Sequence, residues 1–383
     1  MIRSLGSGVS GLRAHQQKLD VAGNNIANVN TIGFKGGSVQ FQDTLSQLAK
    51  GGSGPGAAGG QNPSQVGLGV QVAAVKTNFA QGAAQSTGVP TDLMIAGEGF
   101  FVVNNGAENL YTRNGGFTFD SANRLVTADG SLVQGWMAQD GVVGTGGPLT
   151  GITIPQGATS AAEATTRATV TGNLPSGTAV GGEIVRDITV YDAQGSTRQL
   201  ALTFTRTAGG WDVTDGTTTA SLTLTNGALT GGNLNAGGID VNLAGLTGFA
   251  DLNTVAVTER DGRGSGSLVS YSISKTGEVV GSFSNGSSET LAQVALANFG
   301  NPEGLEKAGN SQYRAAANSG IPTVGAAGTN GLGSLQAGVL EMSNVDLSQE
   351  FTDLIVAQRG FQANARIITT SDEVLQELTN LKR

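Results

Sequence analysis

The sequence feature that most constrains the fold of this chain is a seven-residue apolar repeat at each of its ends. Such a repeat is typical of a helix that buries a narrow stripe against another helix. The sequence between the ends has the short apolar runs and turn residues of strands. We therefore expect two terminal helices that lie side by side, with a β-rich middle. The stripe residues are Ile2, Leu5, Val9, Leu12, Leu19 and Ile26 at the start, and Leu347, Phe351, Leu354, Phe361, Ile368 and Leu375 at the end.

Glycines weaken the first of these helices. Gly6, Gly8, Gly11 and Gly23 fall inside it, and each costs roughly 0.5–1 kcal/mol relative to alanine. A lone amphipathic helix of this length does not recover that cost. We therefore expect close neighbours, where glycine lets backbones approach, and we expect other copies of the chain among them. An intramolecular helical hairpin is the alternative.

The charges of the two ends are complementary. Residues 1–35 hold four bases and one acid, a net charge of +3, whereas residues 341–383 hold seven acids and four bases, a net charge of −3. Exposed ion pairs contribute only ~0–1 kcal/mol each. The pattern favours pairing of the two ends but does not establish it.

Asparagines mark the end of the first helix. Asn24, Asn25 and Asn28 compete with helical backbone hydrogen bonds and favour helix ends. Gly33 fits a C-cap, with Phe34 packing back against the helix. The sequence therefore predicts that the helix stops near residues 30–33 and that the chain bends there. At the other end, Asp346 is the expected N-cap of the last helix.

Two stretches resemble a known family. Residues 21–35 resemble the signature of the bacterial flagellar rod and hook protein family, and residues 343–365 resemble that family's C-terminal block. The resemblance covers about residues 1–45, 66–155 and 265–383. Chain length and a second β-domain favour a hook-type member over a rod-type member.

The resemblance implies a subunit that the flagellar type III apparatus exports unfolded, without a cleavable signal, and that adds under a cap. It would polymerise outside the cell into a curved, flexible tube that passes torque from rod to filament. The implied partners are other copies, the distal rod, the hook cap, the hook–filament junction proteins and the export apparatus. The stripe residues would carry assembly, and residues 24–34 would shape the bend. Phe41 and Leu45 have a spacing similar to the one the family presents to its export gate.

The expected fold class is α+β, mainly β, with the terminal helices forming a coiled-coil inner domain and two nested antiparallel β-domains. Strand-like runs bounded by Gly, Asn or Asp fill the middle of the chain, and residues 50–64 have the composition of a flexible surface loop. The predicted domains are 1–35 with 340–383 (helical), 36–67 (connecting region), 68–152 with 264–339 (inner β-domain) and 153–263 (outer β-domain).

Composition excludes several function classes. A net charge of −8 without a basic stripe argues against nucleic acid, and no apolar run reaches the ~20 residues that span a bilayer. With no cysteine and one histidine, His15, the common nucleophilic triads are nearly excluded. Asp212 and Asp215 lack the remaining ligands of a calcium loop. We therefore expect no enzymatic activity, no metal and no cofactor.

Three alternatives remain open at this point. A distal rod subunit would be straight and stiff. A secreted β-rich adhesin or carbohydrate-binding protein would suit the Thr-, Ser- and Asn-rich strands and would be a stable monomer. An intracellular enzyme has the least support, because no catalytic motif is present.

Overall fold

The computed structural model describes residues 2–52, 54, 59–155 and 157–381. The chain is mainly β with one long helix at each end, as the sequence predicts. Contacts divide it into two compact units. The first comprises Met1–Ile154, Ser272–Val279 and Thr290–Arg383, and the second comprises Pro155–Tyr271 and Val280–Glu289.

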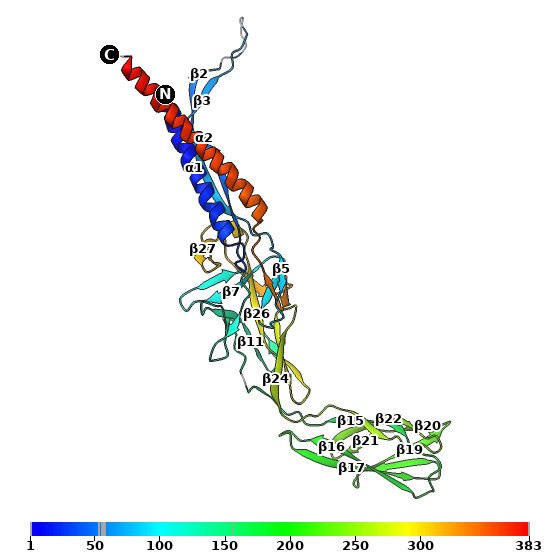
Figure 1. Cartoon of the computed structure of the whole chain (residues 1–383). Helices are drawn as coiled ribbons and strands as arrows, with labels where there is room; N and C mark the ends of the chain where they lie inside the picture. The colour runs from blue at the N-terminus through cyan, green and yellow to red at the C-terminus, as the bar shows by residue number, and fades with distance from the viewer. Residues whose placement is uncertain (1, 53, 55–58, 156, 382–383) are drawn as a thin grey trace. The chain divides into compact units, whose positions relative to one another are not determined.

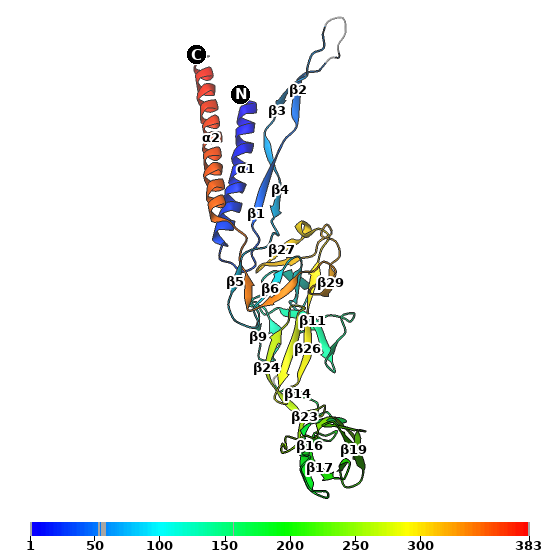
Figure 2. The same ribbon diagram turned by 90° about the vertical axis from the view of Figure 1, so that its right-hand side faces the viewer.

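The two helices belong to the first unit and run antiparallel (Figure 1). Helix α1 spans Ile2–Ala27 and helix α2 spans Leu347–Asn380. Helix α1 packs against α2 on one side and against strands β1 (Gly37–Asp43) and β4 (Val70–Thr77) on another (Figure 2). The predicted N-cap of α2 is confirmed, because the Asp346 carboxylate accepts hydrogen bonds from the backbone N–H groups of Ser348 and Gln349.

Residues 36–67, expected to be a connecting region, instead carry three strands. Strand β1 pairs antiparallel with β4, and beyond them β2 (Ser46–Lys50) pairs with β3 (Ser64–Gly67). Only a weak apolar alternation marks β1, β2 and β3, because Gly, Ser and Gln fill nine of their sixteen positions. Of the loop expected over 50–64, residues 53 and 55–58 lie outside the described residues.

The β-domain of the first unit is built on antiparallel pairs in the order β26-β11-β7-β8-β28-β27. Aromatic rings fill its core, and Phe100 contacts Phe79, Phe299 and Tyr313 edge to face. Its further elements are β5 (Ala84–Ser86), β6 (Leu93–Ala96), β7 (Phe100–Asn104), β8 (Asn109–Thr112), β9 (Thr118–Phe119), β10 (Leu125–Val126), β11 (Leu132–Gln139), β12 (Val142–Val143), β13 (Thr150–Gly151), β26 (Ser288–Asn298), η1 (Pro302–Gly304), β27 (Glu306–Gly309), β28 (Gln312–Arg314), β29 (Thr323–Ala326), β30 (Ser334–Ala337) and β31 (Val339–Glu341).

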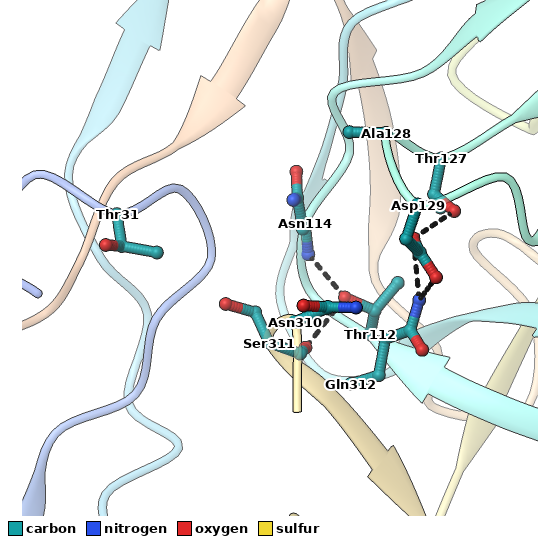
Figure 3. Close-up of a pocket in the computed structure, with 9 residues that line it drawn as sticks. All are labelled: Thr31, Thr112, Asn114, Thr127, Ala128, Asp129, Asn310, Ser311 and Gln312. Atoms are coloured by element: carbon teal, nitrogen blue, oxygen red, sulfur yellow. Dashed lines mark hydrogen bonds between the residues drawn. The ribbon is translucent and has the colours of Figure 1, made fainter. Parts of the chain in front are cut away.

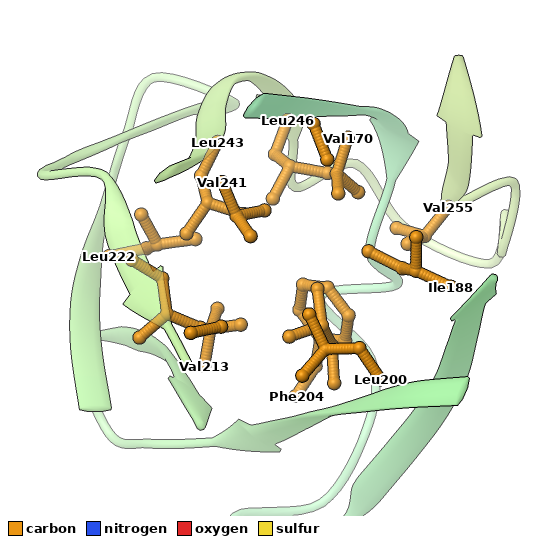
Figure 4. Packing of buried hydrophobic residues seen from close by; sticks show 14 of the residues in the cluster. Val170, Ile188, Leu200, Phe204, Val213, Leu222, Val241, Leu243, Leu246 and Val255 are labelled. Atoms are coloured by element: carbon orange, nitrogen blue, oxygen red, sulfur yellow. The ribbon is translucent and has the colours of Figure 1, made fainter. Parts of the chain in front are cut away.

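The second unit contains one sheet with the order β16-β17-β18-β19-β20-β22-β15-β23, and β21 pairs with β22. Figure 4 shows side chains such as Phe204, Val213 and Val241 pointing into a common interior between the strands. The strands are β14 (Thr159–Ser160), β15 (Arg167–Asn173), β16 (Glu183–Tyr191), β17 (Thr197–Arg206), β18 (Gly210–Thr214), β19 (Thr219–Thr225), β20 (Ala228–Gly231), β21 (Leu234–Ala236), β22 (Ile239–Thr247) and β23 (Ala256–Arg260).

Two details of the second unit differ from expectation. Strands β15 and β22 pair in parallel, so an all-antiparallel domain was wrong; the long connection between them allows the crossover that a parallel pair requires. Strands β24 (Gly266–Ile273) and β25 (Glu278–Phe283) each have residues in both units. Residues 266–271 lie in the second unit, because β24 pairs with β14 there.

Candidate functional site

Neither a metal centre nor a catalytic cluster is apparent in the described part of the chain. No three His, Asp or Glu side chains gather there to hold a metal ion. The pocket in Figure 3 is lined mainly by hydroxyl and amide groups, and its one carboxylate, Asp129, accepts hydrogen bonds from Thr127, Ser131 and Gln312. Within the described residues, neither α1 nor α2 has the length and apolar character of a membrane-crossing helix. The surfaces of the terminal helices are therefore the features to consider.

Small and polar residues make the contact between α1 and α2. The Ser4 and Ser371 hydroxyl oxygens lie 3.5 Å apart. Further along, the Lys18 ammonium donates to Asp353 Oδ1 at 2.8 Å. These pairs place the first turn of α1 beside the C-terminal part of α2, which fixes the antiparallel direction.

Glycines let the two helices approach closely, as the sequence predicts. A β-carbon added at Gly11 would lie 2.6 Å from Oδ1 of Asn364, and one added at Gly360 would lie 2.5 Å from the His15 ring. Gly8 faces Ile368 in the same way, at 3.3 Å. A side chain at Gly11 or Gly360 would therefore force the Asn364 amide or the His15 ring out of its present position.

The predicted apolar stripes lie mostly beside this contact. In the single chain Phe351 is 51% exposed and Phe361 is 37% exposed. Val9 and Leu347 are also exposed. The side chain of Ile2 lies outside the described residues. The other stripe residues are half-buried: Leu5, Leu12, Leu19, Ile26, Leu354, Ile368 and Leu375.

Both stripes come to the same side of the helix pair. Successive residues advance about 100° around an α-helix. On each helix, the stripe therefore lies roughly a quarter-turn from the face that contacts the other helix. On both helices this quarter-turn is in the same direction when the helix is viewed from its N-terminus. Because the helices are antiparallel, that shared sense brings the two stripes to one flank. The single chain therefore presents a two-helix apolar flank.

Helix α2 also exposes apolar residues that the seven-residue pattern does not include. A helix that is apolar on several faces is normally buried on several faces, and contact with α1 covers only one face of α2. These additional exposed residues are Ile355, Val356, Ile367, Val374 and Leu378.

The predicted bend residues tie α1 to the elements that follow it. Asn25 is buried and donates to the Gly37 carbonyl and to Glu350 Oε1, each at 2.8 Å, while its own oxygen accepts from the Gly37 N–H. Asn28 donates to the Asn24 carbonyl one turn back. One asparagine thus joins α1, β1 and α2.

Gly33 acts differently from expectation, and Phe34 contacts a residue of the β-domain. Helix α1 ends at Ala27, so Gly33 does not cap it. Gly33 has a φ of +66°, and a β-carbon there would lie 2.6 Å from the Asn114 backbone nitrogen. Phe34 lies under the Lys307 ammonium, which is 5.5 Å from the ring centre. Both residues therefore fix the bend against the β-domain.

A buried ion cluster beside the bend escaped the sequence analysis. Lys35 and Glu341 are fully buried, and Lys35 Nζ lies 2.6 Å from Glu341 Oε1. Arg113 is 2% exposed, with Nη1 3.5 Å from Glu341 Oε2. Burial lowers the pKa of Lys35 and that of Arg113, against the opposing effect of Glu341. This cluster joins the residue after the bend motif to the residue before the C-terminal block.

We predict that acid weakens the helix pair through His15. Its Nδ1 is buried without a hydrogen-bond partner, and burial, with a smaller effect of Lys18, lowers its pKa from the ordinary 6.5. The unfolded form binds the proton first, so pairing loses stability as the pH falls below about 6.5 and is unaffected above it. Thermal unfolding followed by helical circular dichroism between pH 5 and 8 measures this.

His15→Gln is the matched variant for that experiment, because glutamine is polar and carries no group that binds a proton in this range. The variant should not show the fall in thermal stability below pH 6.5 that the natural protein shows. An equal loss of thermal stability below pH 6.5 in the two proteins would contradict the prediction.

Three family models match the segments that form this site. They are the flagella basal body rod protein at residues 5–35, the flagellar hook protein FlgE/F/G D1 domain at 94–168 and the flagellar basal body rod FlgEFG protein C-terminal at 336–381. Helices α1 and α2, the bend and the β-domain of the first unit thus define a flagellar axial protein.

Full-length relatives narrow the class. The chain is 41% identical to the flagellar hook protein FlgE of Borreliella burgdorferi, covering 100% of both chains. It is 36% identical to that of Salmonella typhimurium, covering 99% and 100%. It is 34% identical to the flagellar basal-body rod protein FlgG of Bacillus subtilis, covering 100% of both. The chain belongs to the flagellar hook protein family and is a structural subunit of the hook.

Proposed function

We propose that this chain polymerises into the hook tube through its terminal helices, which act as a coiled-coil inner domain with two nested β-domains outside it. The observation that carries the proposal is the apolar flank of the helix pair. Phe351 and Phe361 are exposed there in the single chain, and an apolar surface of this kind is stable in water only when another surface covers it. A second copy offers the same flank.

The number of exposed faces favours a polymer over a dimer. One partner on the stripe side would leave Val356, Ile367 and Val374 of α2 exposed on other faces. Several copies packed around each helix cover all of them, as in a tube. Charged residues make up only 13% of the chain, so contacts between the β-domains of neighbouring copies would be polar and weakly charged. Such wet contacts can slide, which a curved tube that transmits torque requires.

The bend residues and the ion cluster would set the direction in which the helices leave the β-domain. Asn25 contacts β1, which follows the bend, whereas Gly33 lies against Asn114 of the β-domain. The Lys35–Glu341 ion pair connects the end of the bend to β31. The second unit would tune the curvature of the tube. No cofactor and no enzymatic activity belong to this function.

Export and partners follow from the same proposal. The subunit would leave the cell unfolded through the type III apparatus and assemble outside under the hook cap, between the distal rod and the junction proteins. Phe41 and Leu45 are exposed, Leu45 to 86%, which is compatible with a role at the export gate. Neither residue is needed for the buried core.

A distal rod subunit is the second candidate, favoured by the full-length match to a basal-body rod protein. Expression in bacteria that lack their own hook protein, and separately in bacteria that lack their distal rod protein, distinguishes the two. We expect curved tubes on detached flagellar bases from the first strain, seen by electron microscopy. Restoration of a straight rod in the second strain alone would overturn the hook assignment.

A further inference from the structure

Two bulky polar side chains interlock with two glycines across the helix contact. His15 of α1 lies over Gly360 of α2, and Asn364 of α2 lies over Gly11 of α1. The two pairs are reciprocal, because four residues separate the side chain from the glycine on each helix. Each helix therefore carries one projecting side chain and one notch, one turn apart.

Other contacts hold both projecting side chains in place. The Asn364 amide donates to the Gly360 carbonyl at 2.9 Å, which keeps it over the contact face. The His15 ring meets the Phe41 ring of β1 edge to face, with 5.7 Å between centres. Neither side chain can leave its notch without losing one of these contacts.

We propose that His15 and Asn364, seated on Gly360 and Gly11, determine the axial register of the two terminal helices. The proposal rests on the proposed function, because the register decides how the two apolar stripes line up for another copy. A slip of one turn displaces one stripe past the other by about 5.4 Å. The flank offered to a neighbouring copy would then have a different pattern.

Among the remaining helix contacts, the hydrogen bond from Asn25 to Glu350 Oε1 agrees with this register, but the contacts nearer the two glycines do not exclude other registers. Ser4 and Ser371 are small, and Lys18 reaches Asp353 with a long, flexible side chain. A slip of four residues either way would set His15 opposite Val356 or Asn364, where no notch exists. The two notches thus exclude the neighbouring registers that the small residues would tolerate.

Disulfide trapping tests the register directly, because the natural chain has no cysteine. Ser4→Cys with Ser371→Cys places two thiols where the hydroxyl oxygens are 3.5 Å apart. In the full-length chain, free and assembled, we expect an intrachain disulfide in most molecules, measured by mass and thiol count. Adding Gly360→Leu should lower that yield at least tenfold. Ser4→Cys paired with Ile367→Cys or Leu375→Cys then reports a slip of one turn.

Exchange of a side chain and its notch separates register from simple damage to the fold. The double change His15→Gly and Gly360→His moves the ring to the other helix. It should return the yield of the disulfide between positions 4 and 371 to the value expected without any change at positions 15 and 360. Gly6→Ala and Gly23→Ala are the controls, because nothing lies within 4 Å of a β-carbon at either position, and they should leave the yield unchanged.

An unchanged yield with Gly360→Leu, or a failure of the exchange to restore it, would overturn the proposal. The outcome is independent of the proposed function. Tubes seen by electron microscopy test assembly, whereas the position of the disulfide tests register even in a chain that forms no tube.

Discussion

Glu341→Gln will destabilise the first unit by about 3–5 kcal/mol, because it leaves Lys35 and Arg113 buried without their countercharge. The glutamine keeps the shape of the side chain and removes only the charge. Each unit has one buried tryptophan, Trp136 in the first and Trp211 in the second. Guanidinium unfolding in the Trp211→Phe background therefore follows the first unit, and the Trp136→Phe background follows the second.

The control for this prediction is Glu303→Gln. Glu303 pairs with Lys76 at 3.6 Å, but both side chains are about half exposed, so the change should cost ~0–1 kcal/mol. Lys35→Met should cost less than Glu341→Gln, because Arg113 and Glu341 then remain as a neutral pair. Equal shifts for Glu341→Gln and Glu303→Gln would show that the buried cluster does not hold the junction together.

The sequence predicted features that have a long or repeated signal. The two helices follow from stripes sustained over several heptads, and the Asp346 cap follows from local hydrogen-bonding chemistry. Most strands of the second unit follow from turn residues at regular spacing. These signals lie within one segment of the chain, so a single sequence reveals them.

The contacts between distant segments could not be predicted in the same way. The helix contact is made by Gly11, His15 and Gly360, which carry no apolar signal, so the stripes drew attention to the flank beside it. Lys35 and Glu341 are 306 residues apart, and each looks like an ordinary surface charge in isolation. Only the folded chain brings these groups together.

Strand β1 escaped prediction for a different reason, although the apolar residues from Val66 to Ala74 indicate a strand where its partner β4 lies. Four of the seven residues of β1 are Gly, Ser or Gln, a composition that suits a loop as well as a strand, and the pairing is further obscured by a bulge between Gln40 and Phe41. Packing of this strand pair against α1, which includes the contact of Phe41 with His15, supplies the stabilisation that local propensity does not.

Phe361→Asp will abolish polymerisation and leave both β-domains folded. Phe361 is 37% exposed in the single chain, so a carboxylate there stays hydrated and the subunit loses little stability. In a tube the same position would be covered by another copy, and an unpaired charge buried at such a contact costs several kcal/mol. Because the contact repeats in every subunit, the cost applies to each addition. Leu12→Asp on α1 should have the same effect.

Thr370→Asp is the matched control, because it adds the same charge to an exposed residue of α2 that shares a helix face with Arg366 and Glu377 rather than with the stripe residues, and it should still assemble. Sedimentation and negative-stain electron microscopy measure assembly, while Trp136 and Trp211 fluorescence report whether each unit is folded. Straight or curved tubes formed by Phe361→Asp would mean that the stripe is not the surface between copies. Loss of tubes together with loss of the Trp136 transition would also contradict the prediction, since the stripe would then support the subunit itself.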